Sequence, residues 1–317
     1  TPRENDVVPL DAVEAPLSLP GHIADLRARA ASSDDTVDAQ LAATLLALMA
    51  REGITSAQPE RWLGAGGTPT TNEECRGDVK LSPSQFERAL ACPLRWFLTT
   101  IGADGPSNAA ASLGTLVHAL AEENPHGTPE ELTEALEARI EELGYNLDTW
   151  AGRHADRRAH AIVDNLASYL VGVPGRVEVE QMVEAQVEGV TIRGRMDRLE
   201  HVDEGVRVTD LKTGKSGHSA KTVPDNPQLA AYQMALLASG AQVAGARIAL
   251  LGGDKPKTFD QKPLEGKTLE EWRGKVREVA AIARGPYFQA TPSEDACRYC
   301  SFDRLCPARE RGRKVVE

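Results

Sequence analysis

Residues 206–212 read Val206-Arg207-Val208-Thr209-Asp210-Leu211-Lys212, and the fold and function are interpreted outward from them. Apolar and polar residues alternate here with the period of two that is typical of a strand, so Asp210 and Lys212 share one face. On that face the carboxylate can hold a divalent cation, and the ammonium can orient water or stabilise developing charge. The alternative is a surface ion pair on an edge strand, which contributes little.

A second carboxylate comes from the segment before this one. Residues 177–187, 190–200 and 206–213 have strand periodicity, with turn residues at 188–189 and 203–205. The second hairpin should bring Asp197, in Gly194-Arg195-Met196-Asp197, beside Asp210. Two neighbouring carboxylates are costly without a cation between them, and hard oxygen ligands suit Mg²⁺ or Mn²⁺.

Helical patterns surround these strands. Capping boxes at Ser82-Pro83-Ser84-Gln85 and Thr128-Pro129-Glu130-Glu131 each predict a helix start. The expected helices cover residues 22–30, 34–50, 82–96 with an interruption at Cys92-Pro93, 112–123, 128–144, 154–170, 227–239 and 268–284, with a short buried strand at 246–251. The fold class is therefore mixed α/β (α+β), with a central mixed sheet flanked by helices.

Length and composition suggest two domains. The chain has 317 residues with 41% hydrophobic and 26% charged residues, which is ordinary globular composition. Residues 64–78 are rich in Gly, Thr and Asn and are interpreted as a loop at a boundary. We expect residues 1–80 to be a helical and linker region that ends a preceding region, and residues 81–317 to be the main domain. Because the chain starts at Thr1, we expect a fragment or processed product.

The charge balance limits how the chain can bind nucleic acid. It has 36 Lys and Arg against 47 Asp and Glu, a net charge of −11, whereas a generic nucleic-acid binder is basic. Binding must then depend on a local site. Residues 298–314 hold six basic and two acidic side chains, which suits a phosphate backbone and equally suits a solvated C-terminal helix.

Cysteine spacing indicates a metal or cluster site. An odd number with tight local spacing is unlike a secreted disulfide framework, so we expect metal binding in the cytoplasm. Cys297-x2-Cys300-x5-Cys306 gives three thiolates, and Cys92 gives a remote fourth. Four thiolates bind zinc or an iron–sulfur cluster, and their number alone does not decide between them. Cys75 is interpreted as an ordinary reduced thiol.

His118 lies in Leu116-Val117-His118-Ala119-Leu120, on an apolar helical stretch. A single His in this setting is more often a core residue than a ligand. Glu122, one turn later, would be placed to orient His118 or approach a metal.

Six motifs in order carry a family resemblance. They are Ser82-x-Ser84-x-Phe86 with Cys92-Pro93, Gly114-Thr115-x-x-His118, Gly194-x-x-Asp197, Asp210-Leu211-Lys212-Thr213-Gly214, Gln228-x-x-x-Tyr232-Gln233 and the three-cysteine tail. Residues 81–307 resemble the RecB-like branch of the PD-(D/E)xK nucleases. More narrowly, they resemble the iron–sulfur nuclease domain of bacterial AddAB/AdnAB helicase–nucleases.

The resemblance implies a restriction-endonuclease-like core with an iron–sulfur clasp, and it assigns roles to residues. It implies that His118, Asp197, Asp210 and the Leu211 carbonyl ligate the catalytic Mg²⁺ or Mn²⁺, with Lys212 assisting water or the transition state. Gln228 and Tyr232 would lie beside the site and help to hold DNA. A structural [4Fe–4S] cluster would be held by Cys92, Cys297, Cys300 and Cys306.

The implied function is a metal-dependent deoxyribonuclease, an exonuclease that attacks phosphodiester bonds with water and forms no covalent intermediate. It would process DNA double-strand-break ends in repair and recombination, as part of an ATP-dependent helicase–nuclease. One alternative is a stand-alone iron–sulfur exonuclease of the CRISPR-adaptation type. Another is a catalytically silent DNA-binding module.

Overall fold

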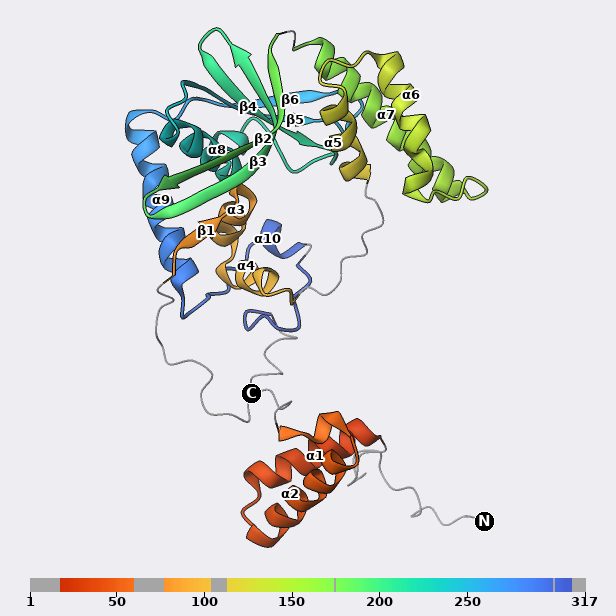
Figure 1. The fold of residues 1–317 in the computed structure, drawn as a ribbon, viewed down its shortest axis with the longest axis vertical. Coiled ribbons are helices and arrows are strands. Elements are labelled where there is room, and N and C mark those ends of the chain that lie inside the picture. The colour runs from red at the N-terminus through yellow and green to blue at the C-terminus, as the bar shows by residue number, and fades with distance from the viewer. Residues whose placement is uncertain (1–17, 60–76, 104–112, 174, 299, 310–317) are drawn as a thin grey trace. The chain divides into compact units, whose positions relative to one another are not determined.

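The computed structural model describes residues 18–59, 77–103, 113–173, 175–298 and 300–309 (Figure 1). The chain divides into two compact units, Thr1–Asn72 and Glu73–Glu317. Residues 1–17, most of the predicted loop at 64–78, Cys75 and the basic residues beyond position 309 lie outside the described residues.

The N-terminal unit contains a pair of helices, α1 (Leu19–Ser32) and α2 (Thr36–Arg51), followed by the 3-10 turn η2 (Thr55–Ala57). Asp35 begins α2 because its carboxylate accepts hydrogen bonds from the backbone N–H groups of Val37 and Asp38. A small apolar core holds the pair together, with Ile23, Leu26, Ala42, Leu46 and Ala57 buried.

The second unit is built on one mixed sheet. Its strands are β1 (Val79–Leu81), β2 (Val177–Val187), β3 (Val190–Val202), β4 (Gly205–Lys212), β5 (Val243–Leu250) and β6 (Lys257–Gln261). They lie in the order β1-β3-β4-β5-β6, with β2 also paired to β3. β1 is parallel to β3 and β4 is parallel to β5, whereas the other pairs are antiparallel. The predicted mixed sheet is confirmed.

Strand β3 has two neighbours along one edge. β1 pairs with Val190, Thr191 and Ile192, and β4 pairs with β3 from Arg198 onward. Between these pairings, residues 193–197 of β3 have no strand partner on this edge in the described part of the chain. Backbone and side-chain groups of residues 193–197 on this edge are therefore available to contact other elements that pack against β3.

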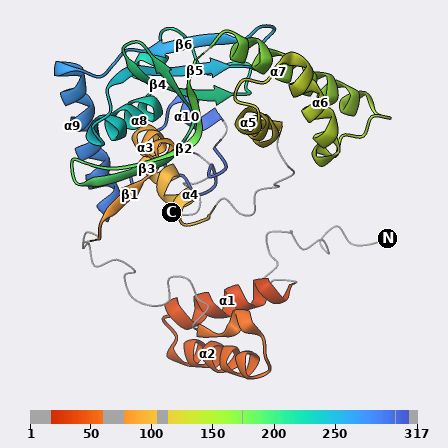
Figure 2. The same cartoon turned by 45° about the horizontal axis from the view of Figure 1, so that its top comes forward.

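Helices cover both faces of this sheet, as expected (Figures 1 and 2). One core is shared with α3 (Pro83–Ala91), α4 (Pro93–Thr100), α8 (Pro227–Ala238) and α9 (Gly266–Arg284). The other is shared with α5 (Leu113–Glu123), α6 (Pro129–Arg139), the 3-10 turn η4 (Ile140–Leu143) and α7 (Trp150–Val171). The 3-10 turn η5 (Val223–Asp225) and the short α10 (Glu294–Arg298) complete the described elements. No helix in the described ranges is both long and apolar enough to span a bilayer.

Local signals placed most helix starts correctly. Both predicted capping boxes are confirmed, at Ser82 for α3 and at Thr128 for α6. The predicted start of α7 at residue 154 is wrong: Thr149 caps the helix by accepting a hydrogen bond from the Gly152 N–H, so α7 begins at Trp150. Strands β1 and β6 were not expected, since three and five residues are too few to show a period.

Candidate functional site

The two predicted acidic residues lie where β3 and β4 separate. The last backbone pair of this ladder is Arg198 with Thr209, so Asp197 and Asp210 come directly after it. Instead of continuing the ladder, the Asp197 carboxylate accepts a 2.7 Å hydrogen bond from the Leu211 backbone N–H. The carboxylate thus enters between the strands, and both acidic residues lie at one opening of the sheet.

Asp210 is buried against two polar side chains, those of Gln228 and Lys212, with 5% of its surface exposed. Gln228, in the first turn of α8, donates a 2.8 Å hydrogen bond from Nε2 to Asp210 Oδ1. Lys212 Nζ lies 2.8 Å from Asp210 Oδ2 as an ion pair and also donates a 3.4 Å hydrogen bond to Gln228 Oε1. The Lys212 ammonium is thus the partner of buried Oδ2.

Burial sets the protonation of this pair. Desolvation raises the pKa of Asp210 to about 6, although Lys212 opposes the rise. For Lys212, burial lowers the pKa, but the neighbouring Asp210, Asp197 and Glu87 raise it by more in sum. The site therefore combines a stable ammonium with a carboxylate whose charge needs further compensation.

His118 and Glu180 complete the acidic site. His118 Nδ1, from α5, lies 3.3 Å from Asp197 Oδ1, and this contact raises the pKa of His118. The ligand atoms of His118, Glu180 and Asp197 all lie within 4.8 Å of one another, a grouping that suits a metal ion. Burial raises the pKa of Glu180, while its ion pair with Arg195 opposes the rise. Glu122 is exposed, and no contact between it and His118 is seen in the described chain.

Sequence reasoning missed Glu180, although a signal was present. The turn at Glu188-Gly189 sets the register of the first hairpin, with Val179 opposite Arg198 and Gln181 opposite Met196. Counting outward from this turn places Glu180 opposite Asp197. Glu180 also has φ of 52°, a conformation that is unusual for a residue other than glycine in a strand.

Helix α8 approaches the unpaired edge of β3. Tyr232 donates a 2.7 Å hydrogen bond from its hydroxyl to the Arg195 carbonyl, which has no strand partner on this edge. Gly194 makes the approach possible, because a Cβ there would lie 2.6 Å from Pro83 Cδ and 3.1 Å from Tyr232 Cε1. Asn226 caps α8 and also donates a 3.2 Å hydrogen bond to Glu87, a carboxyl whose pKa burial raises.

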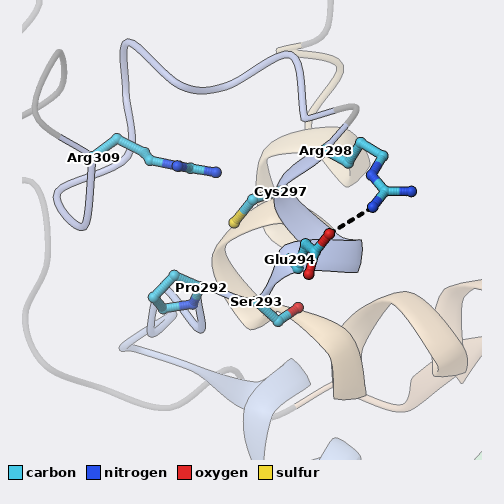
Figure 3. Close-up of a pocket in the computed structure, with 6 residues that line it drawn as sticks. All are labelled: Pro292, Ser293, Glu294, Cys297, Arg298 and Arg309. Carbon is cyan, nitrogen blue, oxygen red and sulfur yellow. Dashed lines mark hydrogen bonds and ion pairs between the residues drawn. The ribbon is translucent and has the colours of Figure 1, made fainter.

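The four cysteines of the predicted cluster line one cavity, together with Arg95. All four thiols are free. Two hydrogen bonds tie α4 to the C-terminal segment: Arg95 Nη1 to the Ala296 carbonyl, 2.9 Å, and the Leu94 N–H to the Gln289 carbonyl, 3.1 Å. In the described part of the chain the sulfurs do not form a group whose members all lie within 4.8 Å of one another. Figure 3 shows Cys297 between Arg309 and the Glu294–Arg298 ion pair.

Comparison with known proteins identifies the superfamily. The chain is 26% identical over 265 residues to the Gene 69 protein of Mycobacterium phage D29, covering 71% of this chain and 96% of that protein. The solved structure of SSO0001 has a TM-score of 0.38 at 17% identity, covering 85% of this chain and 97% of that one. A candidate exonuclease from Eubacterium rectale gives 0.43 at 13% identity, covering 70% and 88%.

A family model described as the PD-(D/E)XK nuclease superfamily matches residues 80–307. This match includes every residue of the acidic site and all four cysteines of the cavity. The chain belongs to the PD-(D/E)XK nuclease superfamily.

Proposed function

We propose that residues 81–317 are a RecB-like, metal-dependent deoxyribonuclease domain that hydrolyses DNA from its ends. The observation that carries this proposal is the group of His118, Glu180 and Asp197, whose ligand atoms all lie within 4.8 Å of one another, next to the buried Asp210 carboxylate. Several acidic groups this close together favour a cation between them. Nuclease activity is the activity of the superfamily to which the chain belongs.

The donor set fits Mg²⁺ or Mn²⁺. Carboxylate oxygens with one imidazole suit these ions. His118, Asp197, Asp210 and the Leu211 carbonyl would hold the ion, and we add Glu180 because its carboxylate lies in the same group as His118 and Asp197. A bound divalent cation supplies Lewis acidity and lowers the pKa of bound water.

Protein side chains have separate roles around such an ion. Gln228 binds Asp210 Oδ1 and so fixes the orientation of the carboxylate. Lys212 has a raised pKa and stays protonated, so it can donate a hydrogen bond to a non-bridging phosphate oxygen as charge develops. Tyr232 holds the free edge of β3 at Arg195, two residues before Asp197, and thereby limits the movement of the Asp197 side chain.

We further propose that Cys92, Cys297, Cys300 and Cys306 hold a structural [4Fe–4S] cluster. Their common cavity and free thiols support this assignment. Cys92 and Cys297 are 205 positions apart, so the cluster would close a long loop and couple metal binding to folding.

Cys300→Ala tests the cluster. Anaerobically purified parent protein should show the visible absorption of an iron–sulfur cluster, and Cys300→Ala should lose both this absorption and thermal stability. Cys75→Ala is the matched control and should keep both. Unchanged absorption and melting in Cys300→Ala would remove the cluster from the account.

The biological setting is the broadest part of the proposal. We propose that the domain acts in the cytoplasm with a helicase region or partner subunit, on double-strand-break ends in repair and recombination. Residues 1–80 would then end the region that precedes it. Arg309 and the Arg298–Glu294 ion pair line a surface pocket of about 500 Å³ beside Cys297, and the charge of Arg309 supports DNA passing on this side (Figure 3).

Digestion of end-labelled single-stranded DNA tests the nuclease. The parent should shorten linear DNA in Mg²⁺ or Mn²⁺ and leave circular DNA intact, and Asp210→Ala should be inactive. Asp225→Ala, which changes an exposed carboxylate, should cleave like the parent. DNA binding without cleavage by folded, iron-containing parent protein would instead support the silent binding module.

A further inference from the structure

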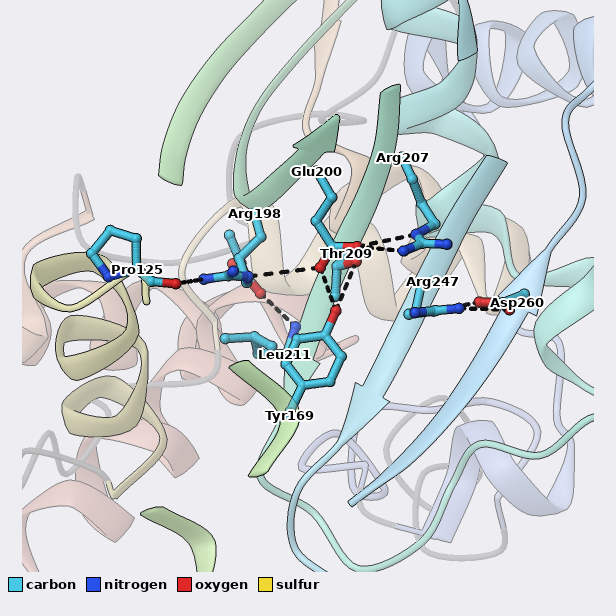
Figure 4. Close-up of polar contacts among 10 residues, drawn as sticks. Pro125, Tyr169, Arg198, Glu200, Arg207, Thr209, Leu211, Arg247 and Asp260 are labelled. Carbon is cyan, nitrogen blue, oxygen red and sulfur yellow. Dashed lines mark hydrogen bonds and ion pairs between the residues drawn. The ribbon is translucent and has the colours of Figure 1, made fainter. Parts of the chain in front are cut away.

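Arg198 follows Asp197 in β3 and is completely buried, with 0% of its surface exposed. Regular alternation from Val190 through Met196 would direct Arg198 toward α8. Instead Met196 and Leu199 pack in the same core, so alternation breaks at Asp197 and Arg198. Arg198 joins a polar group on the α7 side of the sheet that includes Glu200 and Tyr169 (Figure 4).

This guanidinium is poorly compensated where it lies. Nη1 donates a 3.1 Å hydrogen bond to the Pro125 carbonyl, whereas Nε and Nη2 have no hydrogen-bond acceptor in the described chain. Nε lies 3.7 Å from Glu200 Oε1, beyond hydrogen-bond distance. Burial therefore lowers the pKa of Arg198.

Glu200 does not depend on Arg198 for its charge. Arg207 donates hydrogen bonds of 3.0 and 2.9 Å from Nε and Nη2 to Glu200 Oε2, and the Tyr169 hydroxyl donates to Oε1. Removing one partner of a buried ion pair is destabilising where it leaves the other charge uncompensated, but Glu200 would keep Arg207 and Tyr169 if Arg198 were replaced. The stability of the fold thus gives no sufficient reason for an arginine at position 198.

The one complete hydrogen bond of Arg198 reaches the turn that ends α5. Pro125 follows that helix, and Asn124 in the same turn donates a 3.1 Å hydrogen bond to the Leu120 carbonyl. His118 lies on α5, two residues before Leu120, and meets Asp197, the residue before Arg198. Asp197 and Arg198 are adjacent in β3, and both make contacts with this region. Asp197 contacts His118 on α5, and Arg198 contacts the Pro125 carbonyl in the turn that follows α5.

We propose that Arg198 is a positioning residue that holds α5 through the Pro125 carbonyl, so that His118 and Asp197 meet at the metal site. The inference rests on the proposed function, since it assigns a role toward the metal held there. Removing the Arg198–Pro125 hydrogen bond should therefore weaken metal binding by displacing His118, and should leave the other metal ligands in place.

Binding of Mn²⁺ alone, followed by the electron paramagnetic resonance signal of the free ion, tests this role without DNA. Arg198→Met should raise the dissociation constant about tenfold, as loss of a residue that orients a metal ligand does. In a His118→Ala background, Arg198→Met should cause no further change, because the two residues act as one unit. Tyr169→Phe alters the same polar group without touching Pro125 and should bind Mn²⁺ like the parent.

Three results would overturn the inference. The first is parent-like Mn²⁺ affinity in folded Arg198→Met. The second is that Arg198→Met lowers the Mn²⁺ affinity as much in the His118→Ala background as in the parent. The third is that Tyr169→Phe lowers the Mn²⁺ affinity as much as Arg198→Met does. If Arg198→Met does not fold, Arg198→Lys decides: it keeps a donor for Pro125 and should bind within a few-fold of the parent, and a full loss would count against the tether. Absence of Mn²⁺ binding by the parent would instead overturn the proposed function, and the inference with it.

Discussion

Replacing Asp210 by asparagine should stabilise the metal-free protein while abolishing its cleavage of DNA. Burial raises the pKa of Asp210 from 3.8 to about 6, so the folded state binds this proton more tightly than the unfolded chain does. Ionisation of Asp210 therefore costs folding free energy as the pH rises from about 4 to about 6. Asparagine cannot ionise and escapes this cost.

The size of the effect follows from the pKa difference. At about 1.4 kcal/mol per pKa unit, Asp210→Asn should exceed the parent by up to about 3 kcal/mol at pH 8. At pH 5, where the carboxyl is mostly protonated in the folded state, the gain should fall to about half of that. Mn²⁺ at about 100 times its dissociation constant should raise the unfolding free energy of the parent by about 2.7 kcal/mol, and that of the variant by much less.

Urea unfolding in the presence of a chelator, at pH values from 5 to 8, measures this difference. Asp260→Asn is a control of opposite sign, since Arg247 lowers the pKa of Asp260. The ionised Asp260 stabilises the fold above its unfolded pKa, so Asp260→Asn should lose stability at pH 8. A gain for Asp210→Asn that is the same at pH 5 and pH 8, or a loss at pH 8, would refute the reasoning.

Three further substitutions probe the site. Lys212→Met should slow DNA cleavage at saturating metal about 100-fold or more, whereas exposed Lys215→Met should not; equal rates for both would contradict the role of Lys212. Glu180→Gln should weaken Mn²⁺ binding about tenfold, while Glu184→Gln, an exposed change on the same strand, should leave it unchanged; parent-like binding by Glu180→Gln would remove Glu180 from the ligand set. Gly194→Ala should lower the unfolding free energy by about 1–3 kcal/mol in urea titrations, because its Cβ would meet Pro83 and Tyr232; Gly274→Ala on α9 meets no close atom and should not destabilise the protein.

Local sequence signals predicted much of the fold because local physics decides those features. Ser82 and Thr128 cap helices through side chains only three residues from their partners. Strand period and short turns predicted β2, β3 and β4, and hence the approach of Asp197 to Asp210. The pairing of β1 with β3 joins Val79 to Val190, and no local signal reports a contact over such a separation.

Part of the candidate site depends on a break in regular structure. Strict alternation does not predict that Arg198 turns toward α7, since the change of face arises where Asp197 enters between β3 and β4. Glu180 was overlooked because only the register of the first hairpin places it opposite Asp197. The approach of α5, which brings His118 to Asp197, is a tertiary contact that its own apolar pattern does not predict.

Anomalous diffraction from crystals soaked in Mn²⁺ would locate the metal directly. We expect a Mn²⁺ peak bounded by the side chains of His118, Asp197 and Asp210, and loss of this peak in Asp210→Ala crystals. A peak elsewhere on the protein, or none at a Mn²⁺ concentration that supports DNA cleavage, would contradict this expectation.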